Sequence, residues 1–242
     1  MPRATWFLKP PAADAGARLF CLPYSGCGAS MFHGWPGALG PAEVVPLQLP
    51  GRENRMREKH FGTYRDLAVD LVDAIAPHLD RPYGIFGHCG GALPTFEALL
   101  RIDELGLPAP TRCFLSSQVA PQDGPYGRFL GMTGPALHAE LVGLLAELGN
   151  PNPSEDMLDL YVEVLQADLA ANRVYHRAEP VRVSCPLTVI GWDRDVEVPH
   201  ELMGGWAAWG PVAKHVLPGN HYSFLHAPAE LQDLLRQDLV GD

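Results

Sequence analysis

Residues 84–93, GIFGHCGGAL, place a cysteine between glycines where an apolar strand pattern gives way to a helix pattern. The spacing Gly87-x-Cys89-x-Gly91 is typical of a nucleophile elbow, a sharp strand-to-helix turn that presents its central side chain. Such a turn leaves no room for Cβ atoms beside the strained central residue, so glycines are needed there. A small buried cysteine would explain the thiol but not this spacing. Cys89 is therefore predicted to be a nucleophile.

A nucleophile elbow predicts two partners, an acid and then a histidine, on loops that follow later strands. The histidine is His221, in the sequence PGNHYSFL after the apolar stretch 213–218. The stretch 186–191 leads into WDRD, which leaves both Asp193 and Asp195 open as the acid. His221 would accept or hold the thiol proton, and the acid would orient the imidazole ring.

Attack on a carbonyl carbon also requires two backbone N–H groups that point at the developing negative oxygen. Gly90, the residue after the nucleophile, supplies the first. The loop YSGCG after the apolar stretch 18–23 supplies the second through Ser25 or Gly26, and we take Ser25. A dinucleotide-binding loop is a weak alternative, because a third glycine and a downstream ribose-binding acid are missing. The predicted substrate contacts are Tyr24, Gly26 and Gly91.

The elements that must position these residues alternate along the chain. Strand patterns occupy residues 18–23, 43–50, 83–88, 111–117, 186–191 and 213–218. Apolar residues at helical spacing predict a crossover helix over residues 61–79. This alternation is typical of a mostly parallel, doubly wound α/β sheet with helices on both faces.

Two amphipathic segments, 135–149 and 154–176, fall between the fourth and fifth predicted strands with no strand between them. We expect them to form a helical lid, inserted over residues 121–178 of a single domain that spans residues 1–242. The lid residues expected to face the cleft are Met157, Leu160, Tyr161, Val164 and Leu165, although ordinary core packing would produce the same stripe.

Composition excludes several classes of protein. The 242 residues are 47% hydrophobic, which suits one domain with a sizeable core. The formal net charge of −10 argues against a nucleic-acid partner. The five cysteines show no paired C-x-x-C spacing, so we expect neither a disulfide framework nor a metal site. No membrane span or signal peptide is evident, so we expect a cytoplasmic protein that does not bind membranes.

Several motifs resemble those of type II thioesterases that accompany nonribosomal peptide and polyketide synthases. They are LFCLPYSGCGAS, LQLPGRENR, FGHCGGAL, LQADLAANRVY and PGNHYSFL, in that family's order over nearly the whole chain. The resemblance implies an α/β-hydrolase without a cofactor, which acts on acyl or aminoacyl thioesters of phosphopantetheinylated acyl or peptidyl carrier proteins. In that family a valine and then a helix with a tryptophan follow the acid. Val198 and Trp206 therefore favour Asp195, with Asp193 in reserve.

The chain departs from the family pattern at Cys89, where the family usually has serine, and at Gly90, Tyr24 and Gln166. Serine would turn a thioester into a more stable oxygen ester, whereas cysteine exchanges one thioester for another. Our first hypothesis is hydrolytic editing, and the second is transfer of the group between two carrier proteins. A non-catalytic binding protein comes third, because every catalytic position is filled. Cys89 could also be an engineered serine replacement, but the neighbouring departures favour a natural cysteine.

The basic stretch 52–59 is expected to help dock an acidic carrier protein or the pantetheine phosphate through Arg52, Arg55 and Arg57. An enzyme with a net charge of −10 needs some local basic surface to meet an acidic partner. A solvated charged loop would explain these arginines equally well.

Overall fold

A seven-stranded sheet forms the centre of the computed structural model, which describes residues 6–148, 150 and 152–241. Its strands are β1 (Ala17–Leu22), β2 (Ala38–Leu39), β3 (Ala42–Pro46), β4 (Tyr83–His88), β5 (Arg112–Ser116), β6 (Leu187–Trp192) and β7 (Val212–Leu217). They lie in the order β2-β3-β1-β4-β5-β6-β7. Only β2, which pairs with β3, runs antiparallel to its neighbour among these strands. The predicted mostly parallel sheet is confirmed.

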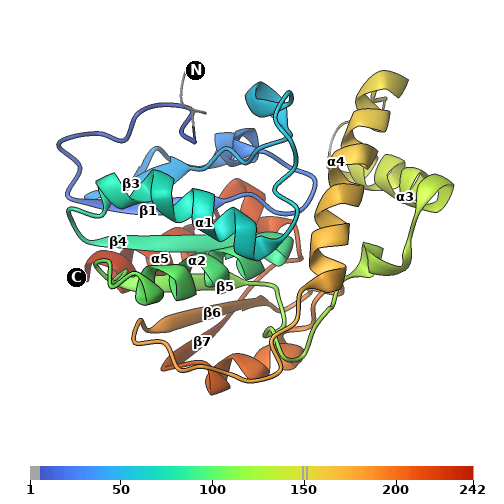
Figure 1. The fold of residues 1–242 in the computed structure, drawn as a ribbon. Coiled ribbons are helices and arrows are strands. Elements are labelled where there is room, and N and C mark those ends of the chain that lie inside the picture. The colour runs from blue at the N-terminus through green and yellow to red at the C-terminus, as the bar shows by residue number, and fades with distance from the viewer. Residues whose placement is uncertain (1–5, 149, 151, 242) are drawn as a thin grey trace.

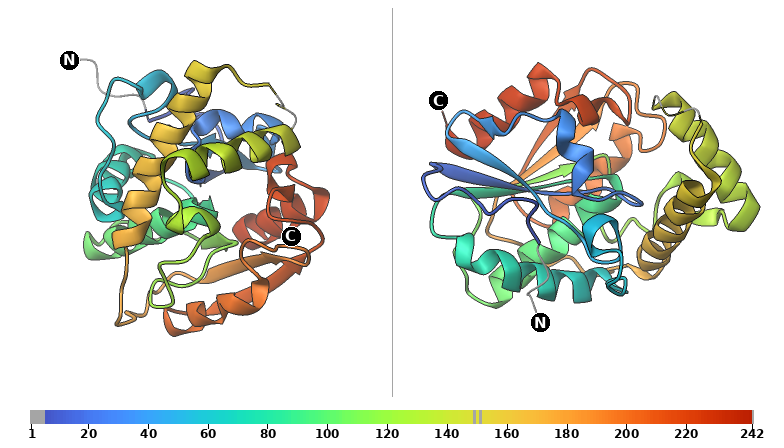
Figure 2. Two further views of the ribbon diagram at one scale, coloured as in Figure 1. Left: turned by 90° about the vertical axis from the view of Figure 1, so that its right-hand side faces the viewer. Right: turned by 90° about the horizontal axis from the view of Figure 1, so that it is seen from above.

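Helices cover both faces of this sheet (Figures 1 and 2). α1 (Tyr64–Ile75) and α2 (Ala92–Glu104) lie on one face, and α5 (Ala229–Val240) lies on the other. α1 begins after Thr63, whose hydroxyl accepts the N–H of Asp66 at 3.1 Å. Its apolar stripe is buried, and the helix stops at Ile75, ahead of Pro77. The crossover helix predicted over 61–79 is thus shorter than expected.

Two helices stand apart from this layered core. α3 (Gly134–Glu147) and α4 (Glu155–Val174) follow β5 in the chain, precede β6 and lie beyond one end of the sheet (Figure 2). They pack together through a separate cluster of buried leucines: Leu137, Leu141, Leu144, Leu158, Leu165 and Leu169. Because this cluster is separate from the core clusters around the sheet, α3 and α4 form an additional layer at the strand ends.

The sequence analysis missed β2 and α5. β2 has two residues, too few to show an alternating pattern. α5 buries Leu231, Leu235 and Leu239 at helical spacing, so its signal was present in the sequence and was overlooked. The strand predicted over 43–50 ends at Pro46, and residues 47–50 leave the sheet.

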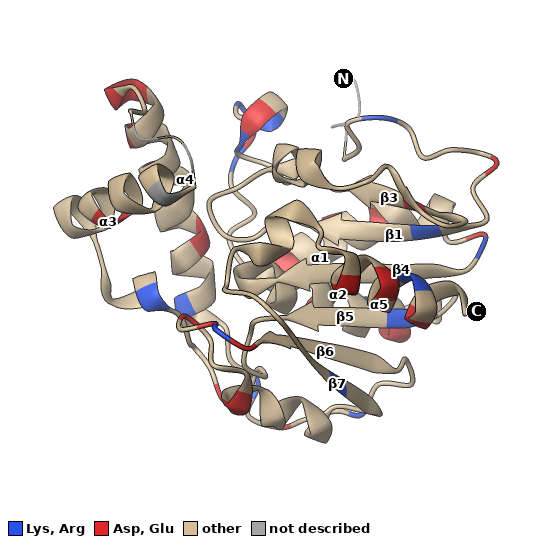
Figure 3. Ribbon diagram, turned by 180° about the vertical axis from the view of Figure 1, so that it is seen from behind, with Lys and Arg blue, Asp and Glu red and all other residues tan. Residues whose placement is uncertain are grey.

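Charged residues are spread over many helices and loops, and Lys and Arg do not gather on one element (Figure 3). Arg18, on β1, is buried and pairs with Asp80 at 2.5 Å. Within residues 6–148, 150 and 152–241, no helix is both long and apolar enough to cross a membrane.

Candidate active site

Cys89 lies at the apex of a tight turn between β4 and α2. A single 3-10 turn, Cys89–Gly91, joins the two elements. The φ angle of Cys89 is +50°, a left-handed conformation that a non-glycine residue adopts at an energetic cost. A Cβ atom at Gly87 would lie 2.3 Å from the carbonyl oxygen of Gly91, so no side chain fits there. The local structure is therefore the elbow that the glycine spacing predicts.

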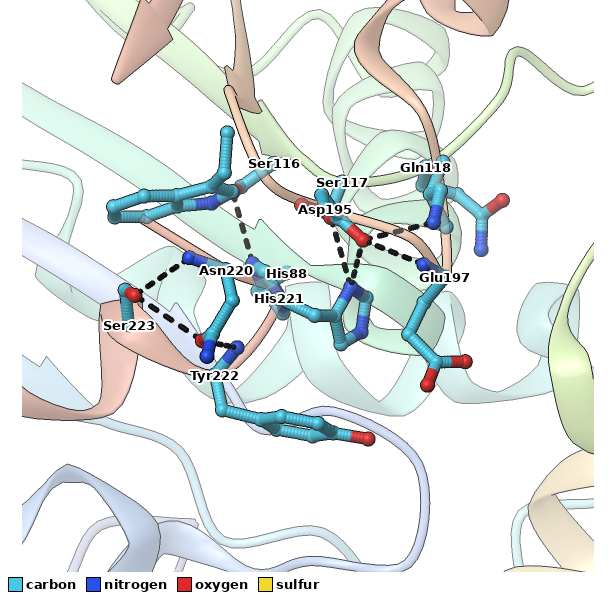
Figure 4. A network of polar contacts seen from close by, with 12 residues as sticks. His88, Ser116, Ser117, Gln118, Asp195, Glu197, Asn220, His221, Tyr222 and Ser223 are labelled. Atoms are coloured by element: carbon cyan, nitrogen blue, oxygen red, sulfur yellow. Dashed lines mark hydrogen bonds and ion pairs between the residues drawn. The ribbon is translucent and has the colours of Figure 1, made fainter. Parts of the chain in front are cut away.

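His221 and Asp195 approach each other from the loops after β7 and β6 (Figure 4). The Nδ1 atom of His221 lies 2.9 and 3.1 Å from the two carboxylate oxygens of Asp195. Asp193 instead accepts the backbone N–H of Gly219 at 2.7 Å and is exposed. Of the two acids that the residues left open, the structure brings Asp195 to the histidine.

The Asp195 carboxylate is held by several donors. The N–H groups of Glu197 and Val198 donate to its Oδ1 at 2.9 Å each, and the Ser117 hydroxyl donates to its Oδ2 at 2.7 Å. Burial would raise the pKa of Asp195, but the hydrogen bond and charge of His221, with the hydrogen bonds from the Val198 N–H and the Ser117 hydroxyl, lower it. Ser117 was not predicted, because nothing in its sequence context distinguishes it from an ordinary strand-end serine.

The electrostatic state of His221 depends on both of its neighbours. Burial would lower the pKa of His221, but the charge of Cys89, with hydrogen bonds to Asp195 and Cys89, raises it to about 10. His88 packs against this ring, with centroids 4.7 Å apart, and its Nδ1 lies 2.8 Å from the Ser116 hydroxyl. Burial, and then the charge of His221, lower the pKa of His88, so His88 is neutral beside a protonated His221.

The loop after β1 lies against the residue that follows the nucleophile. A Cβ atom at Gly90 would lie 2.0 Å from Ser25 Oγ and 3.4 Å from Ser25 N. The N–H of Gly26 donates to Asp168 Oδ2 at 2.7 Å, so this amide is already engaged. Of the two loop amides that the sequence left open, Ser25 is therefore the better candidate for the second oxyanion donor.

Asp168 connects α4 to this loop, a link that the sequence analysis missed. Its buried carboxylate accepts hydrogen bonds from both Nη atoms of Arg52 at 2.7 Å and from the N–H of Gly26, and it lies 2.7 Å from the Nε2 atom of His60. Burial would raise the pKa of Asp168, but the charge and hydrogen bonds of Arg52, with the hydrogen bonds of His60 and of the Gly26 N–H, lower it. Arg52 also donates to the carbonyl oxygen of Cys27 at 3.1 Å. One ion pair thus fixes the position of α4 relative to the loop.

The predicted docking arginines are mostly not on the surface. Arg52 is 2% exposed and Arg55 is 6% exposed. The guanidinium group of Arg55 lies 4.5 Å from the ring centroid of Trp6 and pairs with Glu58 at 2.6 Å. Only Arg57 of the three is exposed. The expectation was wrong for Arg52 and Arg55, because internal carboxylate and aromatic partners bury them.

A cavity of about 490 Å³ opens over Cys89. Cys89, Gly90, Ser25 and His221 line it, together with the predicted contacts Tyr24 and Gly26. The predicted lid residues Leu160, Tyr161, Val164 and Leu165 also line it.

Two residues expected at the substrate do not line this cavity. Met157 lies in the first turn of α4 and is 43% exposed, so its predicted inward orientation was wrong. Gly91 is absent from the lining within the described part of the chain. A Cβ atom there would lie 2.6 Å from the carbonyl oxygen of Pro23, so Gly91 is needed for close packing of the elbow.

Comparisons with known proteins agree with this architecture. The family described as Thioesterase domain matches residues 17–237. "Linear gramicidin dehydrogenase LgrE" of Brevibacillus parabrevis is 34% identical over 98% of this chain and 94% of its own length. "Probable cadicidin biosynthesis thioesterase" of Streptomyces griseus is 30% identical over 90% of this chain and 62% of its own.

Solved structures give the same result. "RedJ-Thioesterase from the Prodiginine biosynthetic pathway in Streptomyces coelicolor" has a TM-score of 0.81 at 33% identity and covers 98% of this chain and 94% of its own. The type II thioesterase YbtT shares the fold, with a TM-score of 0.80 at 21% identity over 96% of both chains. The family match runs from β1 into α5 and includes every candidate site residue. This chain therefore belongs to the thioesterase domain family, and its predicted resemblance to type II thioesterases is confirmed.

Proposed function

We propose that this chain cleaves acyl or aminoacyl thioesters of phosphopantetheinylated carrier proteins through an acyl-Cys89 intermediate, which water resolves. The observation that carries the proposal is that the candidate nucleophile and the candidate acid–base group lie at one cavity. The thiol of Cys89, carried on a strained backbone, and the Asp195-bound ring of His221 line the same cavity. Together with Gly90 and Ser25, they supply a nucleophile, an oriented acid–base group and oxyanion donors.

In the first step, Cys89 Sγ attacks the carbonyl carbon of the bound thioester. An imidazolium next to a cysteine stabilises the nucleophilic thiolate, and the raised pKa of His221 keeps its ring protonated at neutral pH. The negative charge that develops on the carbonyl oxygen is stabilised by the N–H groups of Gly90 and Ser25. The bond to the pantetheine sulfur then breaks, and the leaving thiolate takes the proton from His221.

In the second step, the now neutral His221 removes a proton from water as the water oxygen attacks the acyl carbon. The carbon–sulfur bond to Cys89 breaks, the free acid leaves, and the Cys89–His221 pair is restored. Asp195 keeps Nδ1 of the ring occupied throughout, so Nε2 handles the proton in both steps.

The helices beyond the sheet are proposed as the lid of this single domain, with residues 121–178 as the insertion. Leucines of both α3 and α4 line the cavity, among them Leu141, Leu144, Leu160 and Leu165. An apolar wall of this kind holds the hydrocarbon part of an acyl group and restricts the access of water to the intermediate.

Transfer to a second carrier is the other candidate, and the sulfur of Cys89 favours it. A pantetheine thiol can replace water in the second step, because the acyl group on Cys89 is still a thioester. Cys89→Ser should then suppress transfer more than hydrolysis, since an oxygen ester returns its acyl group to a thiol with difficulty.

The test is intact-mass analysis of the enzyme mixed with an acyl-loaded carrier and an empty phosphopantetheinylated carrier. Cys27→Ala is the matched control, because Cys27 is a second thiol that lines the same cavity. The native enzyme and Cys27→Ala should gain one acyl mass, and Cys89→Ala should gain none. Free acid as the main product would support hydrolysis, whereas acyl mass on the second carrier would support transfer. An adduct that persists in Cys89→Ala would refute the proposed intermediate.

A further inference from the structure

The close contact between Ser25 and Gly90 concerns a side chain, beyond the backbone donors already discussed. Ser25 Oγ occupies the place that a side chain at residue 90 would take, since a Cβ atom there would lie only 2.0 Å away. Real Cβ atoms do not approach an oxygen so closely, so either residue 90 is glycine or the hydroxyl must move. The missing side chain of Gly90 thus leaves the space that the Ser25 hydroxyl occupies.

The hydroxyl that occupies this place is available for a ligand. Across residues 6–148, 150 and 152–241, no group makes a hydrogen bond with Ser25 Oγ. Ser25 is half-buried and lines the cavity beside Cys89. A hydroxyl carries one donor that rotates freely, so it can turn toward an acceptor that appears next to Gly90.

The loop that carries Ser25 is also fixed in place. The N–H of Gly26 is bound to the buried Asp168 at 2.7 Å, and the N–H of Cys27 donates to the carbonyl oxygen of Tyr24 at 3.1 Å. A donor on a rigid loop needs little reorganisation when charge develops, and such preorganised donors are effective in stabilising a transition state.

We propose that the Ser25 hydroxyl is a third donor to the oxyanion that forms when Cys89 attacks the thioester. This inference rests on the proposed function. Gly90 has a double role in it, because its N–H is one of the two backbone donors and its missing side chain makes room for the hydroxyl. The complete oxyanion site then consists of the N–H groups of Gly90 and Ser25 and the Oγ–H of Ser25.

The test compares two reactions of the same thiol. An acyl pantetheine thioester acylates Cys89 through a tetrahedral oxyanion, whereas iodoacetamide alkylates it by direct displacement without one. Ser25→Ala should slow acylation about 10- to 100-fold, as expected for the loss of one oxyanion donor among three, and leave alkylation within about twofold. Ser30→Ala is the matched control, since Ser30 is on the same segment but donates its hydroxyl to Glu53.

A second pair of variants examines the contact itself. Gly90→Ala should also slow acylation, because its new Cβ displaces the Ser25 hydroxyl. In Ser25→Ala/Gly90→Ala the conflict with Oγ is absent, and only the milder 3.1 Å contact with the Cβ atom of residue 25 remains. Acylation of the double variant should therefore be at most about twofold slower than that of Ser25→Ala. Additive losses would contradict the shared role of the two residues.

Three further results would overturn the inference. Acylation of Ser25→Ala at the native rate would show that the hydroxyl does not contact the oxyanion. An equal loss of acylation and alkylation would show that Ser25 acts on the thiol or on folding. If the native enzyme is alkylated at Cys89 but is not acylated by any thioester, the proposed function fails together with the inference.

Discussion

In the proposed mechanism, sulfur at position 89 determines which kind of ester holds the acyl group after the first chemical step. A serine would store the acyl group as an oxygen ester, from which return to a thiol is uphill. In the proposed mechanism, the thiol of Cys89 keeps the group as a thioester, which both water and a second thiol can resolve. The φ angle of +50° presents this atom at the apex of the elbow, and His221 meets it inside the cavity.

Asp195 and Asp193, which follow the same strand, provide a matched pair of variants. Asp195→Asn should lower the rate of acyl transfer to Cys89 at least about a hundredfold, because an amide cannot hold the His221 ring in its charged, oriented form. Asp193→Asn should stay within about threefold, since the polar contacts of the Asp193 carboxylate with the described residues are those to the Gly219 backbone and to Arg194. Stopped-flow acylation with a soluble thioester measures both rates. A similar loss in the two variants would refute the assignment of Asp195.

The protonation of His221 should also appear in the stability of the fold. Its pKa rises from an ordinary 6.5 to about 10 in the folded protein, so between these pH values the His221 ring holds a proton in the folded state that it lacks in the unfolded state. This contribution is fully present below pH 6.5 and is lost as the pH rises through 10, with a slope of up to about 1.4 kcal/mol per pH unit.

Urea unfolding of the native protein and of His221→Gln measures that contribution. The difference in unfolding free energy between the two should shrink from neutral pH toward pH 10, because the glutamine variant has no proton to lose. Other titrating groups contribute to both proteins and largely cancel. A difference that stays constant over this range would mean that His221 is not protonated in the folded state.

At the scale of elements, α4 is tied to the β1 loop by the ion pair of Asp168 with Arg52. The side chains of Asp168 and Arg52 are 4% and 2% exposed, so neither charge is compensated by water. Removal of one partner of such a pair leaves a buried charge alone, which costs more than the pair contributes. The same carboxylate holds Gly26, so the position of α4 and the geometry of the oxyanion loop depend on one side chain.

Asp168→Asn should therefore destabilise the protein by about 3–5 kcal/mol, because Arg52 would remain buried without its counter-charge. Asp159→Asn, on an exposed position of the same helix, should change the stability by no more than about 0.5 kcal/mol. Urea unfolding gives both values. Equal stability of the two variants would contradict the role assigned to this ion pair.

The sequence was sufficient to predict that Cys89, Asp195 and His221 lie at one site, because each follows a strand of a mostly parallel sheet. The carboxyl ends of such strands meet at one edge, so local strand patterns are enough to bring distant residues together. The choice of Asp195 over Asp193 required the family resemblance, since both acids follow the same strand.

Other contacts could not be derived in this way. Arg52 and Asp168 are 116 positions apart and each looks like a surface charge, because charged side chains are seldom buried unless they are paired. The stripe on α4 was correct for Leu160 and Val164 but not for Met157, since periodicity gives the direction of a side chain and not how far the partner surface extends.

In the whole molecule, the sheet layers and the layer of α3 and α4 have different roles. The sheet and its flanking helices hold the elbow and the histidine loop, while α3 and α4 supply the apolar wall of a cavity of about 490 Å³. The net charge of −10 has no compensating patch at Arg52 and Arg55, which are buried. We therefore propose that a carrier protein is recognised through other parts of the surface.

The most direct test of the central claim is whether the acyl-Cys89 intermediate is kinetically competent. The enzyme is mixed with a carrier that is loaded with a labelled acyl group, and the reaction is quenched at short intervals. The protein is then digested, and the mass of the peptide that contains Cys89 is measured. We predict that label appears on this peptide before any product, and that it decays at the rate at which free acid or acylated second carrier forms. Product that forms with no label on this peptide, or a labelled peptide that decays more slowly than product appears, would contradict the account.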